Sequence, residues 1–241
     1  MISVVIPALN EEANLPACLE SLKNQQWSGA FELIVVDNGS TDKTSEVATL
    51  HGALVVKCLK RGVAFARQAG AEVARGDIVA QADADTLYPP GWLGRIGKYF
   101  DAHRSVVGLA GRYEYVHPVW WMPLERAYRR ALNGLSLVFL RWPASVSGAN
   151  FAFRRLAFLR AEGYDPGSLY PDQWGIARRI SRFGKVKYDH SSVVLTSSRR
   201  VAKPAYVIVG EIARNCYHVT QHFAQHCARL IKNLFAGSRD R

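Results

Sequence analysis

Two aspartates one residue apart, Asp83 and Asp85, follow an apolar run that ends at Ala82. Side chains alternate along a strand, so residues i and i+2 project to the same side. If residues 78–82 form a buried strand, both carboxylates converge at its carboxyl end, which is the edge where open α/β sheets bind ligands. Such a pair suits Mg²⁺ or Mn²⁺, which takes one or two protein carboxylates and completes its shell with water and substrate phosphate. The alternative is an ordinary Asp-rich turn.

Two other apolar runs also end in polar residues. Residues 2–6 end at Pro7, and residues 31–36 run directly into Asp37, so both runs are interpreted as buried strands. The Asp37 carboxylate can accept hydrogen bonds from ribose hydroxyls or a base amide. Neither the glycine fingerprint of dinucleotide-binding folds nor a P-loop lysine motif follows the first strand. A phosphate-bearing ligand at this edge must therefore be held by a metal and scattered cations.

The elements that must position these groups alternate in type. Asn10 is placed to cap a first helix, and a second helix follows Asp42. Residues 53–57 predict a further strand, and small and apolar residues at helical spacing predict a helix over residues 61–74. This alternation predicts an α/β fold with a Rossmann-like, mostly parallel central sheet flanked by helices.

The regular alternation breaks down near residue 110. Strands are predicted over residues 106–115, 185–188 and 193–195, and a helix is predicted over residues 172–182. Apolar residues at helical spacing over residues 204–234 predict a C-terminal amphipathic helical extension. On that helix three histidines share one face, which favours a wet polar face over a metal site: His218, His222 and His226.

The composition is that of a globular chain attracted to anions. The 241 residues carry a net charge of +11, and four cysteines without CxxC spacing favour free thiols in a reducing compartment. The N-terminus lacks the basic region of a signal peptide, and no run approaches the roughly 20 apolar residues that span a bilayer. We therefore expect a cytoplasmic protein, soluble or peripheral on the inner face of the cell membrane.

The segment that begins at Trp120 allows two interpretations. Aromatic and sulfur side chains precede a helix with a basic face, and the residues concerned are Trp120, Trp121, Met122, Arg126, Arg129 and Arg130. The aromatic residues either dip into a membrane interface or cover the sheet as part of the core. The net charge favours an anionic membrane surface as a partner, with a lipid-linked or membrane-proximal acceptor.

Taken together, these motifs resemble family 2 glycosyltransferases of the GT-A fold. The matching segments are VVIPALNEE (4–12), VVDNGSTD (35–42), RGVAFARQAG (61–70), RGD (75–77), DAD (83–85) and GANFAFRR (148–155). The first five occur in the family's order and spacing within the first 90 residues, which makes the set specific although each piece alone is weak. The likeness covers roughly residues 1–200.

The resemblance implies a donor site, an acceptor site and a metal site. Residues implied to bind a nucleotide-sugar are Pro7, Ala8, Asn10, Glu11, Asp37, Gly39, Arg61, Arg67, Asp83 and Ala84. Asp37 would lie near the base, Asp83 would face the ribose or sugar, and Asp85 would bind the divalent cation on the diphosphate. Residues 148–150 would lie on the acceptor side: Gly148, Ala149 and Asn150. The implied organisation is a nucleotide-sugar-binding half (1–110), an acceptor-binding half (111–200) and the helical extension (201–241).

The family inverts the anomeric centre by direct displacement, which needs a general base. The family shows Glu-Asp in this region. One alignment places that pair on Asp172-Gln173, and a second places it on Pro171-Asp172 but displaces the helix by one residue. Gln173 accepts no proton usefully, so Asp172 is the predicted base, although Asp also favours the helix N-cap and can serve as both. Thr196 stands where the family often has a histidine near the diphosphate, and the following Arg199 and Arg200 either hold the diphosphate or are solvated.

The expected function is sugar transfer from a nucleotide-diphosphate sugar to an acceptor hydroxyl, in cell-envelope polysaccharide or glycolipid synthesis by family analogy. The anomaly at Gln173 keeps a second hypothesis open, a nucleotide-sugar-binding protein of the same fold with impaired catalysis. A nucleic-acid partner fits the charge, but no recognised module or basic-aromatic platform is present. A nucleotidyltransferase would need a glycine-rich phosphate loop after the first strand, which this sequence lacks.

Overall fold

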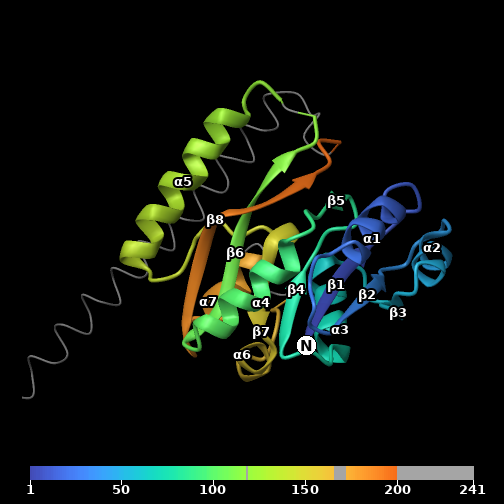
Figure 1. The fold of residues 1–241 in the computed structure, drawn as a ribbon, viewed down its shortest axis with the longest axis horizontal. Helices are drawn as coiled ribbons and strands as arrows, with labels where there is room; N and C mark the ends of the chain where they lie inside the picture. The colour runs from blue at the N-terminus through green and yellow to red at the C-terminus, as the bar shows by residue number, and fades with distance from the viewer. Residues whose placement is uncertain (118, 166–171, 200–241) are drawn as a thin grey trace, which may run out of the picture. The chain divides into compact units, whose positions relative to one another are not determined.

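The structure is a computed structural model that describes residues 1–117, 119–165 and 172–199. Residues Met1–Ser198 form one compact unit. Its strands are β1 (Ile2–Ala8), β2 (Phe31–Asp37), β3 (Leu54–Lys57), β4 (Ile78–Gln81), β5 (Thr86–Leu87), β6 (Val106–Tyr115), β7 (Phe151–Arg154) and β8 (Lys185–Thr196). They form one sheet in the order β3-β2-β1-β4-β7-β6-β8-β5 (Figure 1).

The N-terminal half of the sheet is parallel, as the β/α alternation predicts. β1 lies between β2 and β4, and β3 pairs with the outer side of β2. The register places Ala8 opposite Asp37, so β1 and β2 end at the same level. Both strands extend past the predicted ends, whereas β4 ends at Gln81, one residue early.

The C-terminal half makes the sheet mixed. β7 inserts between β4 and β6 and is antiparallel to both, while β8 runs parallel to β6 and antiparallel to β5. β8 is one strand where two short strands were predicted. Its pairing partner shifts from Asp189 to Val193 as β6 passes from Gly111 to Arg112, so the intervening residues form a bulge.

Helices cover both faces of the sheet. They are α1 (Leu15–Lys23), α2 (Thr44–Leu50), α3 (Val63–Val73), α4 (Trp92–Ala102), α5 (Met122–Phe139), α6 (Arg155–Arg160) and α7 (Asp172–Ile180), with a 3₁₀ turn η1 (Gly148–Asn150). Leu19 of α1 and Leu93 of α4 join the core cluster on the face that carries Val4. On the opposite face α3 packs so closely that a Cβ on Gly70 would lie 2.3 Å from Val5. Burial on both faces explains why the N-terminal strands read as continuous apolar runs.

Helix α5 stands alongside β6 and β8 (Figure 1), and polar side chains attach it to the segment that follows. Asn133 Oδ1 accepts from the Ser145 amide at 2.7 Å, and Ser136 Oγ accepts from the Ala144 amide at 2.9 Å. In the part of the chain that the structure describes, no helix is both long and apolar enough to cross a membrane. The predicted C-terminal helix and its three histidines lie outside the described residues.

The two interpretations of the Trp120 segment are partly resolved. The side chain of Trp120 is 83% exposed, so the interpretation that Trp120 packs in the core is wrong. Its neighbour Trp121 is half-buried and packs edge-on against Tyr115, with ring centroids 6.0 Å apart. The segment therefore combines an anchored aromatic residue with an exposed one.

Candidate active site

Three strand ends meet at one edge of the sheet, as the sequence predicts. Ala8 ends β1, Asp37 ends β2, and Asp83 and Asp85 lie just beyond the end of β4, next to β1. The Thr86 amide donates to the Asp83 carbonyl at 3.2 Å, which closes a tight turn over residues 83–86, called the aspartate turn below. The stretch is therefore an Asp-rich turn, and it lies at the edge where open α/β sheets generally bind ligands.

Asp83 is oriented by the buried side chain of Arg67. Arg67 Nη2 lies 2.8 Å from Asp83 Oδ1, and Arg67 is only 6% exposed. With its amide oxygen facing the guanidinium, Gln173 accepts from Arg67 Nε at 3.1 Å and from Nη1 at 2.7 Å. Gly148 leaves room for Arg67, since a Cβ at that position would lie 1.9 Å from Nη2. One guanidinium therefore joins α3, the aspartate turn, α7 and η1.

A tyrosine that sequence analysis missed, Tyr88, links Asp83 to η1. The Asp83 amide donates to Tyr88 Oη at 2.8 Å, and Tyr88 Oη donates to the Ala149 carbonyl at 3.1 Å. Burial raises the pKa of Tyr88 well above its ordinary value, so the hydroxyl stays protonated as this relay requires. No local sequence pattern marks Tyr88, because its partners depend on the placement of β7 beside β4.

Asp85 lies between the start of β5 and the end of β8. Its carbonyl accepts from the Ser197 amide at 3.0 Å, and the neighbouring Thr86 and Thr196 hydroxyls are 3.0 Å apart. Thr196, which matches the family's histidine position, is thus brought beside the aspartate turn. Burial, reinforced by the charges of Asp83 and Asp85, raises the pKa of the nearby Cys18 thiol, which stays neutral.

Asp37 is fixed by hydroxyl and amide donors. Its Oδ1 accepts from the Ser40 amide at 2.8 Å, and its Oδ2 accepts from Ser45 Oγ at 2.6 Å. Burial alone would raise the pKa of Asp37, but the hydrogen bonds from Ser45 and Ser40 lower it more, so the pKa lies below its ordinary value. The carboxylate is therefore ionised and held in one orientation. Gly39 follows with a left-handed φ of 89°, and Arg61 Nε would lie 3.8 Å from a Cβ placed there.

Asn38, which was not among the predicted site residues, organises the loop that carries Arg61. Its Nδ2 donates to the carbonyls of Cys58 at 3.0 Å and Lys60 at 2.8 Å, and its Oδ1 accepts from the Gly62 amide at 2.8 Å. The available signal was its position directly after Asp37, since an Asn at a strand end often bonds a neighbouring loop backbone.

Asn10 and Glu11 connect the loops after β1 and β2. Asn10 has a left-handed φ of 55°, and its Oδ1 accepts from the Thr41 amide at 2.8 Å. The predicted helix cap at Asn10 is wrong, because α1 begins at Leu15 and Asn10 instead fixes the neighbouring loop. Glu11 is buried, and its amide donates to Thr44 Oγ1 at 2.8 Å.

The predicted acceptor-side residues form η1, packed at the centre of the fold. Asn150 is 3% exposed, and its Oδ1 accepts from Trp92 Nε1 at 2.9 Å. Its Nδ2 donates to the carbonyls of Arg112 at 2.9 Å and Ser192 at 3.1 Å. Asn150 therefore fastens β6 and the β8 bulge to α4, while Gly148 contacts Arg67.

The predicted base lies at the start of α7. The backbone of Asp172 begins that helix, whereas its side chain lies outside what the structure describes. The choice between base and cap therefore stays a prediction. Arg199 is exposed, and Arg200 lies beyond the described residues. The neighbouring Gln173 is buried against Arg67, which places the first turn of α7 next to the Arg67–Asp83 pair.

Comparison with known proteins identifies the family. The model of the family described as glycosyl transferase family 2 matches residues 3–160. An uncharacterised glycosyltransferase of Mycobacterium bovis is 38% identical over 170 residues, which cover 70% of this chain and 75% of that protein.

Solved structures show the same fold. A mannosyltransferase from Pyrobaculum calidifontis superposes with a TM-score of 0.69 at 23% identity, over 93% of this chain and 63% of that one. The glucosyl-3-phosphoglycerate synthase of Mycobacterium tuberculosis gives a TM-score of 0.63 at 25% identity, over 84% of this chain and 74% of that one. This chain thus spans under two thirds of the first of these structures. It belongs to glycosyl transferase family 2 and is a glycosyltransferase with the GT-A fold.

Proposed function

We propose that the protein transfers a sugar from a nucleotide-diphosphate sugar to an acceptor hydroxyl with inversion of the anomeric centre. The observation that carries this proposal is the convergence of Asp37, Asp83 and Asp85 at one edge of the sheet. Asp37 is ionised and fixed, as a group that accepts hydrogen bonds from a nucleoside must be. Of the two solved neighbours described above, one holds GDP-Man with Mn²⁺ and the other holds UDP with Mn²⁺.

A divalent cation, Mg²⁺ or Mn²⁺, fits the aspartate turn. The described residues contain no cluster of three or more His, Cys, Asp or Glu side chains that would hold a metal by themselves. A cation that takes one or two carboxylates and substrate phosphates needs no such cluster. Asp85 would hold it, because Arg67 already occupies one oxygen of Asp83. When bound, the cation would neutralise the charge that develops on the departing diphosphate.

The predicted base acts from the start of α7. The acceptor hydroxyl gives its proton to the Asp172 carboxylate, its oxygen bonds to the anomeric carbon, and the bond from that carbon to the diphosphate breaks. Gln173 contacts Arg67, and Arg67 contacts Asp83, so residue 172 starts close to the group expected to face the sugar. Proximity of a base to the reacting hydroxyl is the main requirement for general base catalysis.

The acceptor is proposed to be a cell-envelope polysaccharide or a glycolipid, met by a peripheral protein at the cytoplasmic face of the membrane. Support comes from two exposed apolar side chains, Trp120 at 83% and Leu124 at 72%, on a segment that also carries Arg126. Apolar side chains beside arginine suit an interface with anionic lipid, as does the net charge of +11.

A screen of UDP-, GDP- and dTDP-sugars tests the function. A donor that binds only the native state raises the melting temperature. We expect one nucleotide class to do so with Mn²⁺ and to release free nucleoside diphosphate when an acceptor is supplied. Stabilisation without product formation from any donor and acceptor would favour the second candidate, a nucleotide-sugar-binding protein, which Gln173 at the family's Asp position motivates.

A further inference from the structure

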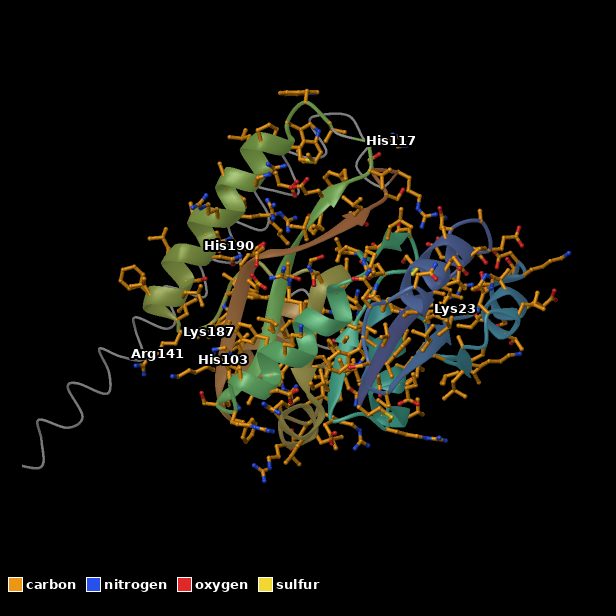
Figure 2. All side chains as sticks on the ribbon, in the orientation of Figure 1. Lys23, His103, His117, Arg141, Lys187 and His190 are labelled. Carbon is orange, nitrogen blue, oxygen red and sulfur yellow. The ribbon has the colours of Figure 1, made fainter. Side chains whose placement is uncertain are left out.

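A cavity of about 330 Å³ lies between α5 and the outer strands of the sheet. Figure 2 shows His190, one of its lining residues, on β8 facing α5. Arginines from two elements line the cavity: Arg112 of β6, and Arg126, Arg129 and Arg130 of α5. A cavity of this size holds a small polar molecule, and its walls are basic.

The positive charges outnumber their partners. Arg129 pairs with Glu125 at 2.7 Å. Arg112 and Arg126 share a single carboxylate oxygen, Oε1 of Glu114, each at 3.2 Å.

The fourth guanidinium, that of Arg130, makes no ion pair within the described ranges. Among the residues that the structure describes, four guanidinium groups therefore face two carboxylates, which leaves an excess of two positive charges at the cavity wall. An excess of this size suits a dianion.

The positions of two of these arginines, Arg129 and Arg112, suit them to bind an anion. Arg129 Nε and Nη2 both donate to Glu125 Oε1, and the guanidinium stacks over the Tyr113 ring with its carbon 4.5 Å from the centroid. Arg112 Nε is buried and has no acceptor in the described part of the chain. The Arg112 side chain as a whole is 34% exposed and lines the cavity, so other nitrogens of its guanidinium are open to a ligand oxygen.

The cavity adjoins the proposed site of transfer. Ser145 and Ser147 line it, and the next residue, Gly148, packs against Arg67. Arg67 in turn contacts Asp83. One short segment thus forms the wall of the cavity on one side and supports the aspartate turn on the other.

We propose that this cavity binds a phosphate group of the acceptor, in a molecule whose hydroxyl reaches the aspartate turn. Guanidinium groups bind phosphate oxygens through paired, charge-assisted hydrogen bonds. That the bound molecule is the acceptor depends on the proposed function. That the cavity binds a phosphate group depends only on the residues of the cavity. A soluble phosphate ester and a phospholipid headgroup share this chemistry.

Inorganic phosphate is the first probe, titrated calorimetrically into the full chain at constant ionic strength with chelator present. The double variant Arg126→Gln/Arg130→Gln removes two cavity charges. The matched control, Arg104→Gln/Arg160→Gln, removes two charges from exposed arginines outside the cavity. We expect saturable binding to the wild type and the control, weakened at least about tenfold in the cavity variant. Absent saturable binding, or equal affinity in both variants, overturns the proposal.

Two further arms locate the source of the phosphate and separate this inference from the proposed function. Glycerol 3-phosphate against glycerol tests a soluble acceptor, and flotation with phosphatidylcholine vesicles with and without phosphatidylglycerol tests a headgroup. The proposal is supported if the wild type prefers glycerol 3-phosphate to glycerol, or vesicles with phosphatidylglycerol to those without, and the cavity variant loses that preference. The proposal is contradicted if the wild type shows neither preference. Binding of the nucleoside diphosphate that the donor screen identifies, measured with Mn²⁺, should be equal in all three proteins. Its absence from the wild type would remove the donor site while leaving the phosphate site standing.

Discussion

Arg67 and Asp83 form an ion pair in which the arginine is almost fully buried and the aspartate remains partly exposed beyond the end of β4. The side chain of Arg67 is 7% exposed and that of Asp83 is 29% exposed. A buried guanidinium cannot shed its charge, so it requires acceptors on its several donors. Asp83 and Gln173 supply them from different elements. The pair therefore fixes the orientation of Asp83 before any ligand arrives.

Replacing the arginine tests this arrangement. Arg67→Met keeps the length of the side chain but removes every donor. We expect a loss of about 3 kcal/mol in the free energy of unfolding, near the lower end for a broken buried pair, because Asp83 remains partly hydrated. Turnover should also fall. Urea denaturation measures the change in the free energy of unfolding. The control variant Arg160→Met, at an exposed position, should change that free energy by less than about 0.5 kcal/mol. Equal stability of the two variants would contradict the role of the pair.

A substitution at Gly148 tests the position of the Arg67 guanidinium by steric displacement. An added Cβ would lie 1.9 Å from Arg67 Nη2, so Gly148→Ala must displace the guanidinium. We expect reduced turnover and reduced stability. The control is Gly134→Ala in α5, where a Cβ meets nothing within 4 Å. Alanine there should stabilise the helix by about 0.5–1 kcal/mol without affecting transfer. Full activity in Gly148→Ala would show that Arg67 can move without consequence.

The hydrogen bonds of Asp37 predict a pH-dependent stability. The folded-state pKa of Asp37 is depressed, so its contribution is present above the unfolded-state pKa and is lost as the pH falls through the folded-state pKa. Ser45→Ala removes the 2.6 Å hydrogen bond to the carboxylate and should cost about 1.5–3 kcal/mol near neutral pH. Denaturation from pH 7 downward should show this difference shrinking once Asp37 is protonated in both proteins. A difference that stays constant with pH would contradict ionised Asp37 as the acceptor.

A substitution at Asp172, the first residue of α7, distinguishes a general base from a helix cap. If Asp172 is the base, Asp172→Asn should lower the rate of transfer by roughly 10²–10⁴-fold while donor binding is kept. If it only caps the helix, the variant should transfer normally and lose at most about 1 kcal/mol of stability. Single-turnover kinetics with a bound donor distinguishes the two outcomes.

The N-terminal half of the fold could be predicted because the end of each strand is visible in the local sequence. β1, β2 and β4 are buried on both faces, and each run of apolar residues stops where polar loop residues begin. The C-terminal half was harder to predict. The bulge between Asp189 and Val193 introduces polar residues that break one strand into two apparent ones. The antiparallel insertion of β7 has no local signature at all.

The site divides in the same way. Asp37, Asp83 and Asp85 could be placed from strand ends, because pairing register alone brings them together. The contacts of Arg67 with Gln173, and of Tyr88 with Ala149, join segments distant in the sequence and depend on packing. The burial of Gln173 against Arg67 also gives its amide a physical function that its place in the family motif did not indicate.

The position of the divalent cation tests the central claim most directly. Crystals grown with Mn²⁺ and the nucleoside diphosphate that the donor screen identifies should show an anomalous manganese peak within bonding distance of the Asp85 carboxylate, with the base beside Asp37. A manganese peak elsewhere, or a nucleotide bound away from the ends of β1, β2 and β4, would contradict the account.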